Sequence, residues 1–157
     1  MRELGHDVHH LTGKSDRPDA VIDLSGSSNP NLLEYLRDSS KDKLLMETTI
    51  RKYSASKLES DTIKKNARGL NKFTTHTTKV LKISAIGQLI VADYFAENIE
   101  EKLEYCKSKV THPITLIDID DLRYLAKVNR SRPSVPALRK ILTSGVLITK
   151  DLIDTSF

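Results

Sequence analysis

Two acidic residues interrupt segments that otherwise have the pattern of buried strands. Glu47 lies in the run KLLMETTI at positions 43–50, and Asp19 begins the run DAVIDL at positions 19–24. Burying an ionised carboxylate is costly unless a cation, hydrogen-bond donors or a metal ion compensates its charge. We therefore expect Asp19 and Glu47 to share one site.

Glu59 supplies a third carboxylate. It lies on a helix predicted over 55–72, where it shares a stripe with Ile63 and Leu70. Either its stem packs while its carboxylate reaches water, or it points into the site of the other two acids. Carboxylates of this kind suit Mg²⁺, which keeps several waters and takes its remaining ligands from substrate phosphates. The three acids therefore predict a magnesium site for phosphate chemistry.

The elements that would hold these acids follow from apolar periodicity. Strands are expected at 7–11, 19–24, 43–50, 79–86 and 112–117, with Gly87 ending the fourth of them. Helices are expected at 55–72, at 91–109, from Asp118 or Asp120 through Val128, through 138–142, and after a cap at Thr149. This order predicts an α/β fold with a central mixed β-sheet flanked by helices.

The composition is that of a single soluble domain. The chain has 157 residues, of which 38% are hydrophobic and 29% charged, and its apolar runs are too short to span a membrane. Its first residues contain no apolar signal core. The single cysteine, Cys106, excludes an internal disulfide and favours a reducing cytoplasm, and we expect it to be a small buried residue on a helix.

The charge pattern leaves two interpretations open. A net charge of +4 suits an anionic partner, and basic residues cluster after position 50 and again between 127 and 140. A solvated surface and a phosphate-binding track both account for such runs. The sequence has no Gly-rich phosphate loop, no paired Cys-x-x-Cys spacing and no His-Glu-x-x-His motif. Because His9 and His10 would point to opposite faces of a strand, we interpret them as structural.

The two acids and their neighbours resemble the core of the PD-(D/E)xK nucleases. The matching residues are Arg17-Pro18-Asp19-Ala20-Val21-Ile22 and Leu44-Leu45-Met46-Glu47-Thr48-Thr49. In that family, an acid after a proline and an acid on the next strand bind magnesium. The resemblance implies a restriction-endonuclease-like fold in which Asp19 and Glu47 are catalytic metal ligands.

A wider resemblance covers most of the chain. Four further segments are similar to the cleavage domain of FokI-type type IIS restriction endonucleases. They are the approach at 4–14, the helix with Leu103 and Cys106, the strand and helix at 114–125 and the tail at 142–149. It implies one cleavage domain over residues 1–157, as a fragment or subunit lacking a DNA-recognition domain. The implied substrate is double-stranded DNA, cut to leave 5′-phosphates. The implied partners are a DNA-recognition domain or subunit and, for cutting, a second copy of the chain.

The motif departs from the family pattern at Thr49, where a lysine contacting the attacking water is expected. An AlwI-like branch instead carries an acid, any residue, a threonine or serine and an aliphatic residue, with a further acid on the next helix. Glu47, Thr48, Thr49 and Ile50 match that branch, as does Glu59.

This variant motif implies roles for several further residues. The carbonyl of Thr48 would add a ligand to Mg²⁺, for which Mn²⁺ can substitute, and Glu59 would bind a second ion or a bound water. Lys65 or Lys52 would stabilise the leaving phosphate, with Asn66 near the last motif position. The basic residues implied in DNA binding are Arg17, Arg51, Lys52, Lys64 and Arg68.

Other functions stay open. Thr49 is also consistent with a nuclease-like fold that has lost catalysis and serves as a DNA-binding or subunit-interaction module. A transposase-like or repair nuclease subunit would use the same fold. The closing helices at 135–153 have the order of a helix-turn-helix, but we expect them to be scaffold.

Overall fold

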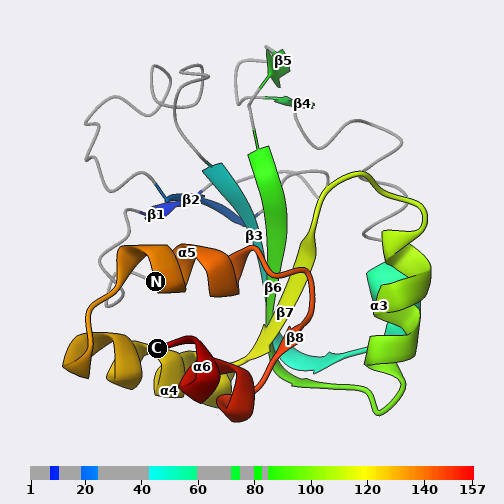
Figure 1. Ribbon diagram of the computed structural model, residues 1–157. Helices are drawn as coiled ribbons and strands as arrows, with labels where there is room; N and C mark the ends of the chain where they lie inside the picture. The colour runs from blue at the N-terminus through cyan, green and yellow to red at the C-terminus, as the bar shows by residue number, and fades with distance from the viewer. Residues whose placement is uncertain (1–7, 11–18, 25–42, 60–71, 75–79, 83–84) are drawn as a thin grey trace.

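The apolar runs of the sequence form one mixed, six-stranded β-sheet (Figure 1). The computed structural model describes residues 8–10, 19–24, 43–59, 72–74, 80–82 and 85–157. In spatial order the strands are β1 (Val8–His10), β2 (Ala20–Asp23), β3 (Lys43–Tyr53), β6 (Ala85–Phe95), β7 (Ile114–Asp118) and β8 (Leu147–Ile148). β2 pairs antiparallel with β1 and with β3, whereas β3, β6, β7 and β8 run parallel to one another.

Helices cover both faces of this sheet. One face carries α4 (Ile119–Ser131), α5 (Val135–Leu142) and α6 (Lys150–Ser156), and the other carries α3 (Ile99–Lys107) (Figure 1). Met46 and Val91 pack in the cluster of the first face, whereas Ile90 and Ala92 pack in the cluster of the second face with Leu103. Removing these side chains from water is the main driving force for the layered arrangement. The predicted α/β fold with a central mixed sheet flanked by helices is confirmed.

Three helices begin at side chains that accept a hydrogen bond from the first turn. Asp118 accepts from the amide of Asp121 at 2.7 Å, and Thr149 accepts from the amide of Leu152 at 3.4 Å. Ser134 caps α5 in the same way. Such caps satisfy amides that lack an intrahelical partner. The caps predicted at Asp118 and Thr149 are therefore confirmed.

The sequence prediction was wrong over β6. Gly87 lies inside this strand rather than at its end, and Val91 and Phe95 belong to the strand rather than to a helix. Because β6 lies between β3 and β7 with helices on both faces, all residues from 87 to 92 are buried. A strand buried on both faces has no polar–apolar alternation by which to recognise it. The helical spacing of its apolar residues is coincidental, and α3 begins only at Ile99.

Smaller segments also differ from the prediction. Lys72 does not end a helix, because β4 (Lys72–Thr74) pairs with β5 (Val80–Lys82) in a separate two-stranded sheet. The strand expected at 79–86 divides between β5 and β6, and the sequence does not predict β8. Cys106 is buried on α3, as expected. In the part of the chain described, no helix is both long and apolar enough to cross a lipid bilayer.

Gly87 should be sensitive to a single added methyl group. A Cβ at this position would lie 3.1 Å from the carbonyl oxygen and from Cγ of Pro113, and 3.3 Å from Cδ1 of Leu44. Because backbone and core atoms must move to admit it, Gly87→Ala should lower the free energy of unfolding by about 1–3 kcal/mol. Urea unfolding measures this change. Ser144→Ala, an exposed substitution, is the control, and equal stability of both variants would contradict the tight packing at Gly87.

Candidate functional site

The ladder between β2 and β3 ends on the side chain of Asp19. The two strands pair from Asp23 opposite Lys43 to Ala20 opposite Met46. Beyond this point the amide of Thr48 donates to Oδ2 of Asp19 at 2.6 Å, and the Thr48 hydroxyl donates to the same oxygen at 2.8 Å. The carboxylate of Asp19 thus takes the place of a main-chain acceptor.

These two hydrogen bonds fix the orientation of the carboxylate. Hydrogen bonds to an ionised acceptor are shorter and stronger than those between neutral groups. Both hydrogen bonds that the described residues donate to Asp19 end on Oδ2. Asp19 is exposed, and a ligand therefore has access to it.

Glu47 lies on β3 where the strand leaves the core. Residues 43–46 are buried, and beyond them burial alternates, with Glu47 and Thr49 half-buried and Thr48 and Ile50 exposed. Glu47 pairs in register with Ile90 of β6. Glu47 and Thr49 therefore share one face of β3, and Thr48 and Ile50 share the other.

Asp19 and Glu47 therefore lie at the same place in the sheet. Asp19 directly precedes the first residue of β2, and its carboxylate is bonded to the residue that follows Glu47 on β3. Each acid supplies carboxylate oxygens, the donor type that Mg²⁺ prefers.

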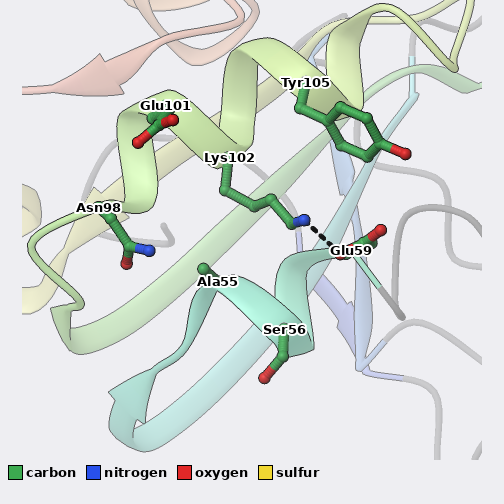
Figure 2. A pocket seen from close by; sticks show the side chains of 7 residues that line it. All are labelled: Ala55, Ser56, Glu59, Asn98, Glu101, Lys102 and Tyr105. Carbon is green, nitrogen blue, oxygen red and sulfur yellow. Dashed lines mark ion pairs between the residues drawn. The ribbon is translucent and has the colours of Figure 1, made fainter.

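Glu59 has a different neighbour. Ser54 begins a helical turn at 55–59, with its hydroxyl accepting from the amide of Lys57. At the end of this turn Glu59 forms an ion pair with Lys102 of α3 (Figure 2). Within the described ranges, no three His, Cys, Asp or Glu side chains are grouped so that they could hold a metal ion. In this structure Glu59 is paired with the ammonium of Lys102, and its role as a third acid beside Asp19 and Glu47 stays a prediction.

The Glu59–Lys102 pair lines a pocket of about 360 Å³ between the turn at 55–59 and α3. Figure 2 shows the side chains of Ser56, Glu101 and Tyr105 around it. The ammonium of Lys102 also lies 4.6 Å from the centre of the Tyr105 ring. Sequence periodicity predicts that Lys102 lies on the solvated side of its helix, but it carries no signal that Glu59 is the partner, since this contact is not local.

The remaining predicted site residues divide into two groups. Arg51 and Lys52 are exposed at the carboxyl end of β3. The predicted site residues that lie outside the described ranges are Arg17, Lys64, Lys65, Asn66 and Arg68.

Comparison with solved structures shows what this fold is similar to. The chain matches the structure of restriction endonuclease FokI bound to DNA, with a TM-score of 0.58 and 13% sequence identity, over 95% of this chain and 26% of that one. It matches a second structure of restriction endonuclease FokI with a TM-score of 0.58, 14% identity and the same coverage. The chain therefore spans about a quarter of the length of FokI, an extent consistent with the cleavage domain. No protein-family model and no curated protein sequence matches the chain.

The Glu59–Lys102 pair should make stability depend on pH in the alkaline range. The hydrogen bond from Lys102 to Glu59, together with the charge of Glu59, holds the pKa of the Lys102 ammonium above its usual value. A folded-state pKa above the unfolded one contributes stability that is present below the unfolded pKa and is lost as pH rises through the folded pKa. The difference in stability between wild type and Glu59→Gln should therefore shrink as the pH rises past the usual lysine pKa.

Urea unfolding of both proteins from about pH 8 to about pH 12 measures this dependence. Glu101→Gln, which removes an exposed carboxylate beside Lys102, is the matched control and should show a constant difference from wild type. A constant difference for Glu59→Gln as well would contradict the ion pair.

Proposed function

We propose that this chain is a divalent-metal-dependent DNA endonuclease domain that hydrolyses phosphodiester bonds. The observation that carries the proposal is the Asp19 carboxylate held by Thr48 beside Glu47, in a fold similar to part of FokI. The same two acids and their spacing carry the resemblance to the PD-(D/E)xK nucleases.

The donor atoms suit Mg²⁺, with Mn²⁺ as a substitute. Asp19 and Glu47 are hard carboxylate donors, and the main-chain carbonyl of Thr48 is a further oxygen on the strand that carries Glu47. When bound there, the ion would lower the pKa of an attacking water and offset negative charge on the phosphate. Thr48 would hold Asp19 in position through its amide and hydroxyl, so that Oδ1 faces the ion.

Cations near the acids would bind the DNA backbone. Tyr53 packs in the same cluster as Ala92, the register partner of Thr49, so the alternation of β3 continues to the end of the strand. Arg51 therefore lies on the side of Glu47 and Thr49, and Lys52 lies on the opposite side. Both are exposed and can reach phosphates that flank the cut.

Glu59 would act as a further metal-binding acid only after its ion pair with Lys102 is broken. Its carboxylate is paired with Lys102, so a role for Glu59 in binding a second ion requires release from that ammonium. Lys65 also remains a proposed catalytic residue, and the proposed DNA-contacting residues outside the described ranges are Arg17, Lys64 and Arg68.

The whole reaction is proposed by analogy with the enzyme that the fold resembles. We infer that residues 1–157 form one cleavage domain that acts in the cytoplasm on double-stranded DNA and leaves 5′-phosphate ends. A separate DNA-recognition domain or subunit would select the site, and two copies of the chain would cut the two strands.

Removing either acid should abolish cleavage. Asp19→Asn and Glu47→Gln keep the shape of each side chain but remove the charge that holds the cation, so the rate of nicking of supercoiled plasmid in Mg²⁺ should fall by about 100-fold or more. Asp151→Asn and Glu100→Gln, which change exposed acids on α6 and α3, are matched controls and should cleave like wild type.

Equal cleavage by wild type and both site variants would overturn the proposal. An inactive wild type would favour the alternative of a decayed nuclease, for which Thr49 is the specific observation. In that case Thr49→Lys should restore plasmid nicking, because it supplies the ammonium that the family motif places there.

The Thr48 hydroxyl should affect the rate of cleavage only through its hydrogen bond to Asp19. Thr48→Val keeps the shape of the side chain and the amide but loses the bond from Oγ1 to Oδ2. The rate of plasmid nicking should fall about 10- to 100-fold, as for other residues that orient a metal ligand, and should partly recover at higher Mg²⁺. Thr48→Ser retains a hydroxyl and should keep most of the activity. Equal loss in both variants would show that packing of the threonine methyl group, rather than the hydrogen bond, is responsible.

A further inference from the structure

β3 contains a bulge just after the acidic site. Thr49 pairs with Ala92 and Lys52 pairs with Tyr94, so Ile50 and Arg51 lie opposite Asp93 alone. A bulge of this kind bends the strand, increases its twist and re-aims side chains, and bulges are common beside active sites.

Two large apolar side chains at this bulge are exposed to solvent. Ile50 is 85% exposed and Tyr94 is 56% exposed. A β-branched residue in a strand ordinarily packs against the core, and here the strand has carried Ile50 past the end of the hydrophobic cluster that includes Met46. The other large apolar residues with comparable exposure in the described ranges, Tyr105 and Val135, lie on helices.

Ile50, Lys52 and Tyr94 lie on one face of the sheet. Ile50 and Lys52 follow Met46 in the strand alternation, and Tyr94 is the register partner of Lys52. We call these three residues the bulge patch. The hydroxyl of Thr48, which holds Asp19, belongs to the same face, so the patch adjoins Asp19, whereas Glu47 faces the other side of the sheet.

The cationic and apolar side chains at the bulge patch suit a ligand that is a polyanion and also has apolar surface. Lys52 provides a positive charge within the patch and Arg51 a second one on the other side of the strand, and Asp93 lies opposite Arg51 at the bulge. Duplex DNA offers phosphates to such cations and sugars and base edges to apolar side chains, and isoleucine is among the residues that DNA-binding proteins insert between base steps. Two apolar side chains beside a lysine are too small a surface for a stable protein dimer.

Access to the bulge patch follows from the strand pairing. β2 pairs with β3 only up to Met46, so along Thr48–Lys52 the ladder partner of β3 among the described residues is β6 alone. The exposure of Ile50 and Tyr94 gives a ligand access to both side chains.

We propose that Ile50 and Tyr94 contact duplex DNA next to the scissile phosphate and hold it in register with Asp19. This inference rests on the proposed nuclease function for the identity of the ligand. It adds an apolar contact that the metal site and the phosphate-binding cations do not provide.

The test is a titration of a short fluorescein-labelled DNA duplex, followed by anisotropy, with Ca²⁺ in place of Mg²⁺ so that the DNA stays intact. Ile50→Thr keeps β-branching, and Tyr94→Gln keeps a long planar side chain. Each should weaken DNA binding about tenfold, the scale of one lost apolar contact to a base. Val135→Thr and Tyr105→Gln make the same changes at exposed helical sites and should bind like wild type.

The salt dependence separates the apolar contact from charge. Between about 50 and 200 mM salt, the slope of log affinity against log salt should fall by about one for Arg51→Gln and for Lys52→Gln, because each loses a phosphate contact. Ile50→Thr and Tyr94→Gln should keep the wild-type slope while the affinity is lower at every salt concentration. Thermal unfolding confirms that the exposed substitutions leave the fold intact.

Three outcomes would overturn the inference. They are wild-type DNA affinity in Ile50→Thr and Tyr94→Gln, no binding of the duplex by wild type at low salt, or a change in sedimentation without a change in DNA binding, which would assign the bulge patch to a protein contact. Failure of the cleavage proposal is distinguishable, because plasmid nicking that is insensitive to Asp19→Asn would refute that proposal while leaving this DNA contact supported.

Discussion

The ladder between β2 and β3 ends at the carboxylate of Asp19, which accepts hydrogen bonds in place of a main-chain carbonyl. The geometry of the proposed site depends on this replacement. A main-chain carbonyl bonded to Thr48 would extend the antiparallel pairing of β2 with β3. The side chain instead takes the amide and hydroxyl of Thr48, which stops the ladder and presents a charged oxygen to solvent. The same hydrogen bonds that end the secondary structure therefore orient the group proposed to bind the cation.

The rest of the sheet makes this end of β3 rigid enough to serve as a site. β6 is buried on both faces, between β3 and β7, and pairs with β3 along both halves of that strand. Functional groups placed on strands of a packed sheet are held more precisely than those on loops. The pairing of β3 with β6 places Glu47 opposite Ile90. The hydrogen bonds from Thr48, the residue after Glu47, hold the carboxylate of Asp19. The buried residues 43–46 of β3 thus anchor the more exposed part of the strand that follows them.

Local patterns predict the parts of this structure that local physics determines. The strands at 19–24 and 43–50 and the caps at Asp118 and Thr149 follow from alternation and from side-chain chemistry within a few residues. β6 could not be recognised, because burial on both faces removes the alternation, and its identity depends on strands far away in sequence. The partner of Glu59 could not be recognised for the same reason, since Lys102 comes from a different element. The hydrogen bonds from Thr48 to Asp19 could not be predicted either, because they join residues 29 positions apart in the sequence.

Thr49 is the residue at which the proposed mechanism must differ from the family pattern. It is half-buried and faces the side of the sheet on which Ala92 and Tyr53 pack. A lysine there would have an apolar surrounding on one side and the Glu47 carboxylate on the other. The threonine has no charge, so the positive charge near the scissile phosphate must come from another position. Arg51 follows on the same side of the strand, is exposed and has a longer side chain than threonine. A guanidinium is charged at every physiological pH, so it can stabilise a phosphate but cannot accept a proton from water. Activation of the attacking water would then fall to the cation held by Asp19 and Glu47 rather than to a side-chain base.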